Sequence, residues 1–432
     1  MKILITAYAS EPGAGSEYGV GWMVPTIMAR YNVRHEIYVL TRSRCKDKII
    51  KALEDLQLPN LHFMFYDISK WCTYPNEMHS GWGEQINYIL WQLGAIRYVK
   101  KINKQIGFDI IHHLTFNQYR TPSPGFWLDI PFVMGPIGGA ECIPDVFVQD
   151  LDERTRKKER IRRKGVDLKV FEYLVSKKKN RKVILCSCGE NLHRLQPCGN
   201  GCDFRLLPSI AYDLKDLDNI LNGSSNGVKA FNVEKTKIDD SKAFEMMYAG
   251  KALDWKGVKF FLNAAKLAFS DAEAKRDWCI KIIGVRFEEE QRNLKTWINQ
   301  FGLEKHVELI PFVSRDELLR MMSRCSISVY PAFRDSGSMS VLEASALGCP
   351  TICLATGGQD VFPDDVLLKV SVKNTYEDTL HLFADKLQWA YEHEEETKNI
   401  GCRAQRWVSE NLTWEKKVKD FINIYEDIVE KG

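Results

Sequence analysis

The stretch from residue 327 to residue 358 constrains the fold more than any other part of this sequence. It opens with an apolar run, 327–330, which is typical of a strand buried in a parallel sheet. A loop of small and polar residues follows at 334–338, and the pattern then predicts a helix over 339–347, ended by a Gly and a Pro. A second apolar strand is predicted at 351–354. This order of strand, loop, helix and strand predicts a βα unit in an α/β fold.

The same alternation continues along the whole chain in two series. Seven strands are predicted in the first series, at 2–8, 36–41, 61–66, 109–115, 132–134, 183–188 and 204–207. Five are predicted in the second, at 244–249, 279–283, 307–312, 327–330 and 351–354. Helical stretches such as 18–31 and 87–106 separate most of the strands. Short strands with intervening helices predict two parallel sheets.

The length of 432 residues is too great for one ordinary core and predicts two domains. We predict a first Rossmann-like domain over 1–210, a linker over 211–243 and a second Rossmann-like domain over 244–410. The linker contains the loop-forming sequence LNGSSNG, and the last part of the chain, 411–432, is predicted to be a terminal helix. Ligands bind such sheets at the carboxyl ends of the strands, so we expect the two domains to face a cleft.

The loop before the predicted helix at 339–347 has the features of an anion site. The backbone N–H groups of Gly337, Ser338 and Met339 are expected to converge with the positive end of the helix dipole. Two carboxylates flank this point, Asp335 in the loop and Glu343 in the helix. A ligand that carries both a diphosphate and many hydroxyls would suit amides and carboxylates together.

The spacing Asp335-x7-Glu343 resembles the acidic-x7-Glu signature of family 4 retaining glycosyltransferases, which have the GT-B fold. Asp335 stands where Glu is commoner, and Ser338 where a second Gly is usual. The resemblance implies that Glu343 holds the nucleotide ribose, that Asp335 lies against the donor sugar, and that the final helix packs back on the first domain. An ordinary βα unit with a solvated Asp and a Glu on the helix surface would have the same spacing.

Two lysines are predicted to lie near this loop. Lys251 follows the strand at 244–249, and Lys256 opens the next helix. Ammonium groups can stabilise the charge that develops on a departing diphosphate. Their positions resemble the Gly-Arg and Lys-Gly element of the same family, with Lys251 in the place of the Arg. A surface lysine near a helix start is the alternative for Lys251.

The first domain contributes further candidates from its first loop and its fourth strand. Gly13 and Gly15 form a GxG, but Tyr18 stands where a dinucleotide-binding loop would have its third Gly. The resemblance implies instead that the amide of Gly15 approaches the donor phosphate, although a turn before a helix would look the same. His112 and His113 end the strand at 109–115 and alternate in direction, so at most one enters the cleft. The resemblance favours His113 beside the donor sugar, and a core histidine is the alternative.

The sequence MGPIGGAE at 134–141 resembles the GPxGG loop of transferases that act in surface-polysaccharide synthesis, with Glu141 as a possible hydroxyl ligand. Between Glu153 and Lys182 there are fourteen Lys and Arg against four Asp and Glu. This basic tract is either a solvated helix face or a surface that contacts anionic lipid. The net charge of +3 for the chain gives no reason to expect nucleic acid.

The twelve cysteines are scattered, and Met1 leads into a predicted strand without a signal-type apolar region. We therefore expect a cytoplasmic protein with reduced thiols, either free or peripheral at the membrane. The four cysteines at 186, 188, 198 and 202 invite a zinc site, but their spacing matches no known zinc module. No apolar run approaches the ~20 residues of a membrane span.

These features together predict a retaining glycosyltransferase that moves a sugar from a UDP- or GDP-sugar to a glycan or lipid-linked glycan acceptor. The expected mechanism needs no metal and no cofactor, because lysines and amides can stabilise the diphosphate. Another activity on the same fold, such as nucleotide-sugar epimerisation, remains open. So does a non-catalytic protein that binds a glycan or a nucleotide. The incomplete GxGxxG argues against an oxidoreductase.

Overall fold

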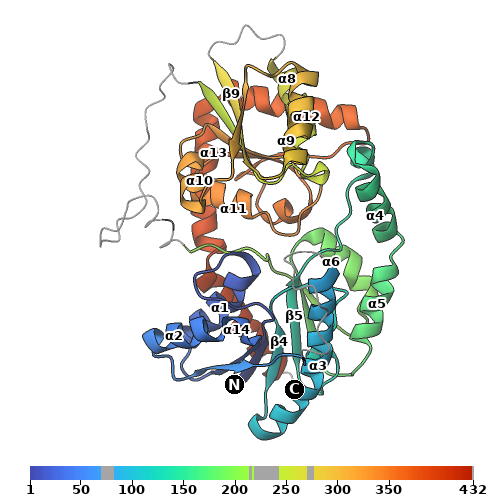
Figure 1. The fold of residues 1–432 in the computed structure, drawn as a ribbon, viewed down its shortest axis with the longest axis vertical. Coiled ribbons are helices and arrows are strands. Elements are labelled where there is room, and N and C mark those ends of the chain that lie inside the picture. The colour runs from blue at the N-terminus through green and yellow to red at the C-terminus, as the bar shows by residue number, and fades with distance from the viewer. Residues whose placement is uncertain (70–81, 214–216, 218–242, 270–276, 431–432) are drawn as a thin grey trace. The chain divides into compact units, whose positions relative to one another are not determined.

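The chain folds around two parallel sheets in a computed structural model that describes residues 1–69, 82–213, 217, 243–269 and 277–430 (Figure 1). Unit 1 consists of Met1–Ala140, Lys164–Ser209 and Trp414–Gly432, and unit 2 of Glu141–Arg163 and Ile210–Thr413. Most of the predicted linker, 214–216 and 218–242, lies outside the described residues.

Unit 1 contains a seven-stranded sheet in the order β3-β2-β1-β4-β5-β6-β7, and every pairing is parallel. The strands are β1 (Lys2–Thr6), β2 (Glu36–Thr41), β3 (Leu61–Phe65), β4 (Ile110–His113), β5 (Phe132–Ile137), β6 (Lys182–Cys186) and β7 (Asp203–Leu206). The central strands are apolar and buried on both faces, as expected of a parallel sheet covered by helices.

Helices cover both faces of this sheet. They are α1 (Ser16–Tyr31), α2 (Lys46–Leu56), α3 (Trp82–Ile106), α5 (Val166–Val175), α6 (Gly189–Leu195) and α14 (Trp414–Glu430), with short 3₁₀ turns η1 (Ser43–Cys45), η3 (Pro124–Phe126) and η5 (Gln196–Cys198). The chain's last helix, α14, lies along its first, α1 (Figure 1). Phe421 and Tyr425 of α14 are fully buried in the core that α1 shares with β1 and β2.

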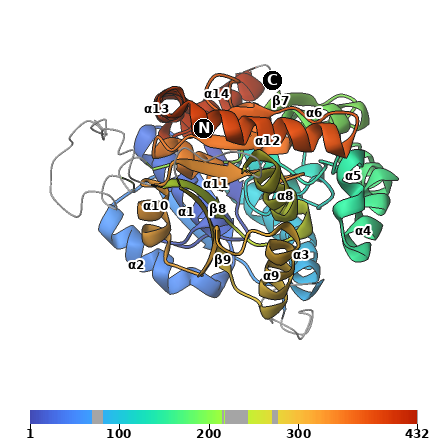
Figure 2. The same cartoon turned by 90° about the horizontal axis from the view of Figure 1, so that it is seen from above.

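Unit 2 contains a six-stranded parallel sheet in the order β10-β9-β8-β11-β12-β13. The strands are β8 (Phe244–Ala249), β9 (Trp278–Val285), β10 (Val307–Pro311), β11 (Ile327–Tyr330), β12 (Thr351–Leu354) and β13 (Leu368–Val370). Its helices are α4 (Glu153–Arg163), α8 (Val258–Phe269), α9 (Glu288–Phe301), α10 (Arg315–Met322), α11 (Met339–Ala346), α12 (Tyr376–Glu392) and α13 (Glu394–Asn411), with η4 (Asp145–Asp150), η6 (Asp254–Lys256) and η7 (Gly357–Val361). Figure 2 shows α12 against α8 on one face of the sheet.

The assignment of Glu141–Arg163 differs from the prediction that residues 1–210 form one domain. This segment belongs to unit 2, where Ile143, Phe147 and Leu151 enter the same apolar core as Phe260. The sequence lacks a sign of this, because the segment lies between two strands of the unit 1 sheet, β5 and β6. Burial of its apolar side chains, not its place in the chain, decides which unit it joins.

The predicted fold of two Rossmann-like α/β domains is confirmed. Four predicted strands, at 36–41, 244–249, 327–330 and 351–354, match the structure residue for residue. The strand predicted at 109–115 is shorter, since β4 ends at His113, and the three-residue strand β13 was not predicted. So short a strand carries too few residues to show a period.

Candidate functional site

The sheet order places a natural binding point in unit 2 between β8 and β11. The chain runs from β8 outward to β9 and β10, and then returns to the other side of β8 with β11. At such a reversal the loops after the two strands diverge at the carboxyl edge of the sheet. The loop after β8 contains Lys251 and Lys256, and the loop after β11 contains Asp335.

Lys256, Asp335 and Tyr330 form a compact polar cluster at this edge. The Lys256 Nζ lies 2.5 Å from the Asp335 Oδ2 and 3.0 Å from the Tyr330 hydroxyl oxygen. The Tyr330 hydroxyl donates a hydrogen bond to the same carboxylate oxygen. Burial, together with the neighbouring Asp335 charge, raises the pKa of Tyr330 well above its ordinary value. The tyrosine therefore stays protonated and acts as a donor. It was not among the predicted site residues, although it ends the predicted strand.

The loop that begins at Asp335 is folded tightly on its own groups. The Asp335 Oδ1 accepts a hydrogen bond from the Gly337 N–H at 3.2 Å, which closes an Asx turn. The Met339 N–H donates to the Gly337 carbonyl at 2.9 Å. The amides of Gly337 and Met339, which were expected to converge on an anion, are therefore already paired in this structure, because a side-chain carboxylate and a carbonyl accept from them. The first turn of α11 still presents N–H groups without intrahelical acceptors.

Two glycines allow the neighbouring loops to approach this turn. Gly257 has φ +70°, and a Cβ placed there would lie 2.0 Å from the carbonyl oxygen of Pro331. Gly357 has φ +54°, and its Cβ would lie 2.2 Å from the carbonyl oxygen of Asp335. That carbonyl accepts a hydrogen bond from the Gly358 N–H at 2.7 Å. Three chain segments thus meet at the backbone of residues 331–335, and larger residues at Gly257 or Gly357 would force them apart.

Ser338, which stands where the family usually has Gly, is fully buried. Its Oγ donates to the Gln359 Oε1 at 3.0 Å and so links the loop to η7. The next residue, Met339, is 38% exposed at the start of α11. The Ser338 side chain therefore makes a hydrogen bond to Gln359 that a glycine could not make.

Glu343 lies on α11, one turn beyond Met339, and its side chain is 11% exposed. Its Oε1 lies 3.2 Å from the Arg315 Nε, and the Arg315 guanidinium also lies 3.5 Å from the Tyr212 hydroxyl. Arg315 opens α10, whose N-cap is Ser314. Neither Arg315 nor Tyr212 was predicted, because only the fold brings α10 beside α11.

Lys251 is exposed at the carboxyl end of β8, and its carbonyl accepts a hydrogen bond from the Tyr248 hydroxyl at 2.8 Å. Within the described residues its ammonium makes no ion pair. The structure brings Lys256, but not Lys251, into contact with Asp335.

Unit 1 has its own reversal of strand order, between β1 and β4. The predicted residue Gly15 lies in the loop after β1, and the predicted residue His113 is the last residue of β4. Gly15 caps α1, with open space around the position of a Cβ. The neighbouring Glu17 accepts a hydrogen bond from the Phe116 N–H at 2.9 Å and so joins the two loops. Burial raises the pKa of Glu17, because the carboxylate loses solvent.

His112 and His113 point to opposite faces of the sheet, as their alternation predicts, and both are fully buried. His112 contacts Tyr425 of α14 through its Nδ1 and the Gly135 carbonyl at 2.7 Å through its Nε2. The His113 Nε2 lies 3.0 Å from the hydroxyl of Tyr88 on α3. Desolvation lowers the pKa of His112 to about 4 and that of His113 to about 3, so both rings are neutral at pH 7.

Glu141 belongs to unit 2 and is 1% exposed. Its carbonyl accepts a hydrogen bond from Arg162 at 3.3 Å. The structure therefore does not present this side chain on the surface, in contrast to the expectation of an open glycine-rich loop.

The cysteines that suggested zinc do not converge on a metal site. Cys186 ends β6, while Cys188, which the predicted strand at 183–188 included, lies beyond it as the N-cap of α6. In the part of the chain that the structure describes, no group of three or more His, Cys, Asp or Glu side chains could hold a metal ion. No helix among the described residues is both long and apolar enough to cross a membrane.

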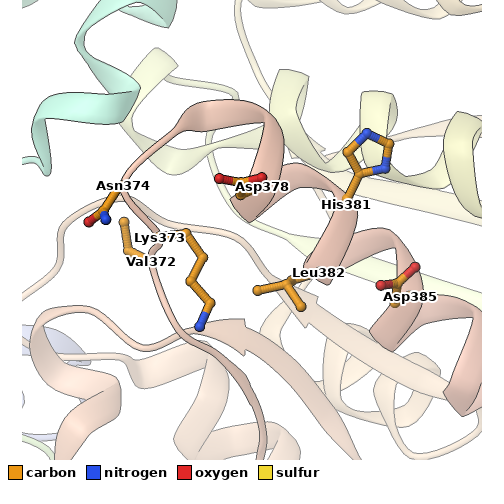
Figure 3. A pocket seen from close by; sticks show the side chains of 7 residues that line it. All are labelled: Val372, Lys373, Asn374, Asp378, His381, Leu382 and Asp385. Carbon is orange, nitrogen blue, oxygen red and sulfur yellow. The ribbon is translucent and has the colours of Figure 1, made fainter.

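A separate cavity of about 470 Å³ lies at the amino end of α12 (Figure 3). Asp378, His381, Leu382 and Asp385 project from one side of that helix, and Lys373 and Asn374 come from the segment before it. None of these residues belongs to the Lys256–Asp335–Tyr330 cluster. The cavity therefore gives no support to the predicted site.

Part of the chain is similar in sequence to known glycosyltransferases. Residues 229–407 match a family model described as Glycosyl transferases group 1. A D-inositol 3-phosphate glycosyltransferase of Paenarthrobacter aurescens is 24% identical over 187 residues, which cover 43% of this chain and 45% of the relative. The match thus spans less than half of the length of this curated relative. These matches support a group 1 glycosyltransferase.

Solved structures share the fold along the whole chain. Sucrose-phosphate synthase from Thermosynechococcus elongatus has a TM-score of 0.62 at 14% identity, with 100% of both chains covered. Anabaena HepE, solved in complex with UDP and glucose, has a TM-score of 0.56 at 13% identity and covers 99% of this chain and 100% of its own. Identities this low show the fold alone, which is the GT-B fold of two Rossmann-like domains.

Proposed function

We propose that the protein is a retaining glycosyltransferase that uses a nucleoside diphosphate sugar, UDP- or GDP-linked, as its donor. The observation that carries the proposal is the cluster of Lys256, Asp335 and Tyr330 at the reversal point of the unit 2 sheet, with Glu343 one turn into the helix α11 that follows the Asp335 loop. This cluster lies inside the region that matches the group 1 family model. The HepE structure, solved with UDP and glucose, is in keeping with a nucleotide sugar donor.

Each residue of the cluster suits one part of such a donor. Glu343 would accept hydrogen bonds from the ribose hydroxyls, and Arg315 fixes its orientation. Lys256 and the first-turn N–H groups of α11 would stabilise the diphosphate, with Lys251 as a second cation. Asp335 would accept from hydroxyls of the sugar. Ser338, through its bond to Gln359, would hold the loop that joins these groups.

The chemistry proposed is electrostatic. As the bond between the sugar and the diphosphate breaks, negative charge grows on the leaving phosphate, and a preorganised ammonium stabilises that charge without reorientation. A donor phosphate oxygen would accept the proton of the acceptor hydroxyl on the same face, which retains the configuration of the sugar. Gly15 remains a proposed donor contact. His113 also remains proposed as one, but its side chain is fully buried and would need to become exposed. Glu141 remains proposed only as a hydroxyl ligand and would need to become exposed.

The acceptor proposed is a glycan or a lipid-linked glycan of a surface polysaccharide. Beyond the GPIGG sequence, support comes from the outer face of α5. Val166, Val170 and Tyr173, at helical spacing, are 56%, 42% and 59% exposed. The Lys177 Nζ lies 3.4 Å from the centre of the Tyr173 ring, and exposed Lys178, Lys179 and Arg181 follow. Apolar and basic groups side by side suit the surface of an anionic membrane.

The test is a thermal shift panel of nucleotides and nucleotide sugars, with and without Mg²⁺. A ligand at a hundred times its dissociation constant should stabilise the protein by about 2.7 kcal/mol. We expect stabilisation by UDP or GDP that is lost in Glu343→Ala and kept in the control Glu308→Ala, whose residue lies on β10. Nucleotide release that is slow with water alone and rises when an acceptor is present would distinguish a transferase from an epimerase. No shift with any nucleotide would overturn the proposal.

A further inference from the structure

The segment Glu141–Arg163, which we call the strap, contacts both loops of the proposed donor site. It consists of η4 and α4, and its place in unit 2 was not foreseen from the sequence. One part of the strap packs on the loop after β11, which contains Asp335. Another part packs on η6, which ends at Lys256.

The contact with the loop after β11 is both apolar and ionic. Phe147 stacks on Phe333 with ring centres 4.1 Å apart and planes within 7°, and both rings are buried. The Glu159 Oε2 lies 2.9 Å from Arg334, the residue before Asp335. The side chains of Arg334 and Glu159 are 17% and 3% exposed, so solvent screens this ion pair little.

Glu159 is held in place by the strap itself. Its Oε1 accepts a hydrogen bond from the Ile143 N–H at 2.8 Å, and the Arg162 Nε lies 3.5 Å from its Oε2. The carboxylate therefore does not depend on Arg334 for all of its partners. Among the described residues of unit 2, in contrast, the carboxylate that pairs with Arg334 is that of Glu159.

The contact with the loop after β8 begins at Asp254. The Asp152 N–H donates to the Asp254 Oδ2 at 2.9 Å, and the Thr155 hydroxyl donates to its Oδ1 at 3.4 Å. Asp150 pairs with Lys259, the second residue of α8, at 3.1 Å. The strap thus reaches both loops whose side chains meet in the Lys256–Asp335 pair.

The charge of Arg334 explains why its contact with the strap matters for the Lys256–Asp335 pair. Arg334 is next to Asp335 in the chain, and its guanidinium would compete with the Lys256 ammonium for the Asp335 carboxylate if it were left unpaired. A guanidinium with little solvent access needs an acidic partner, because burial of an unpaired charge is strongly unfavourable. Glu159 supplies that partner from the opposite side.

We infer that Glu159 is a positioning residue of the donor site: it neutralises Arg334 and thereby keeps Asp335 on Lys256. The inference rests on the proposed transferase function. It predicts that loss of the Glu159 charge lowers turnover while the binding of the nucleotide, which we assign to Glu343, persists.

The test compares Glu159→Gln with wild type in two measurements. One is the rate of nucleotide release from UDP-glucose or GDP-mannose, according to the base that the thermal shift panel selects. The other is the Kd of the corresponding nucleoside diphosphate by calorimetry. We expect kcat to fall at least tenfold while Kd changes less than threefold. Wild type without activity on either sugar nucleotide would count against the proposed function, whereas an active wild type with an equally active Glu159→Gln would overturn this inference alone.

Two further variants separate positioning from a merely structural role. Arg334→Gln leaves Glu159 paired with Arg162, so the double variant Glu159→Gln/Arg334→Gln should recover kcat to within about threefold of wild type. A double variant that is no better than Glu159→Gln would contradict the inference. Glu245→Gln is the matched control, because it removes the 2.5 Å pair with Lys281 at the amino end of β8 in the same unit.

Should Glu159→Gln not fold, Glu159→Asp keeps the charge and shortens the side chain by one methylene. We then expect kcat to fall at least threefold with Kd unchanged. Equal kcat in Glu159→Asp and wild type would overturn the inference.

Discussion

At the scale of single residues, the site depends on side chains whose partners lie far along the chain. Lys256 and Asp335 were both predicted as site residues, but their direct ion pair at 2.5 Å is a finding of the structure. An ammonium that lies between a carboxylate and a phenol oxygen is held in one direction before any ligand arrives. Such preorganisation is what makes a cation effective against a developing charge.

We predict that Lys256→Ala lowers kcat by about 10²–10³, because it removes the cation that we propose to stabilise the leaving diphosphate. The measurement is steady-state release of the nucleoside diphosphate at saturating donor. Lys369→Ala is a suitable control, since Lys369 is a mostly buried lysine of the same unit that pairs with Asp364 at 2.9 Å. An alanine variant with near-wild-type turnover would remove Lys256 from the proposed mechanism.

At the scale of elements, β4 carries two neutral histidines into the interior of unit 1. Each has a pKa lowered by burial, to about 4 for His112 and about 3 for His113, against an ordinary value of 6.5. As the pH falls, the unfolded chain therefore takes up protons at these positions at a higher pH than the folded chain does. Stability falls as the pH drops below 6.5 and stops falling through these groups only near pH 4 and pH 3.

We predict that the free energy of unfolding decreases by roughly 1.4 kcal/mol per pH unit for each histidine between about pH 6 and pH 4. Urea unfolding at a series of pH values measures this slope. The two histidines together contribute one part of this slope, and His112→Gln should halve that part. His193→Gln, at an exposed position on α6, should leave it unchanged. Equal slopes in wild type and His112→Gln would show that His112 is protonated in the folded protein.

At the scale of the whole molecule, the order of segments in the chain does not follow the two units. Residues Glu141–Arg163 interrupt unit 1 and join unit 2, and Trp414–Gly432 returns to unit 1 after unit 2 is complete. The last helix then fills the core beside β1 and α1 with Phe421 and Tyr425. Each unit therefore needs residues from more than one part of the chain.

The exposed apolar and basic residues of α5 and the segment after it, in unit 1, support a prediction about membrane binding. We predict that the protein co-sediments with vesicles that contain phosphatidylglycerol and not with vesicles of phosphatidylcholine alone, and that 0.5 M salt weakens the binding. Val170→Asp/Tyr173→Asp should reduce binding at least tenfold, because it places charge in the exposed apolar stripe of α5. The matched control is Leu382→Asp, at an exposed position on α12 of unit 2. Wild type that binds neither kind of vesicle would exclude the membrane contact.

The amino-acid sequence by itself determined the fold class and supplied candidate residues for the proposed site. Apolar runs, helix periods and glycine-rich turns are local features, and they indicated the two parallel sheets and placed Lys256, Asp335 and Glu343 in loops or helix starts at strand ends. Their signals depend on residues close together in the chain.

The tertiary structure alone decided which side chains meet. Tyr330 joins Lys256, Arg315 joins Glu343, and Glu159 joins Arg334, a residue 175 positions away. It also decided that both histidines are buried and that the amides of Gly337 and Met339 already have acceptors. The physical reason is that burial and long-range pairing depend on how whole elements pack against one another. That packing produces no periodic pattern in a single sequence.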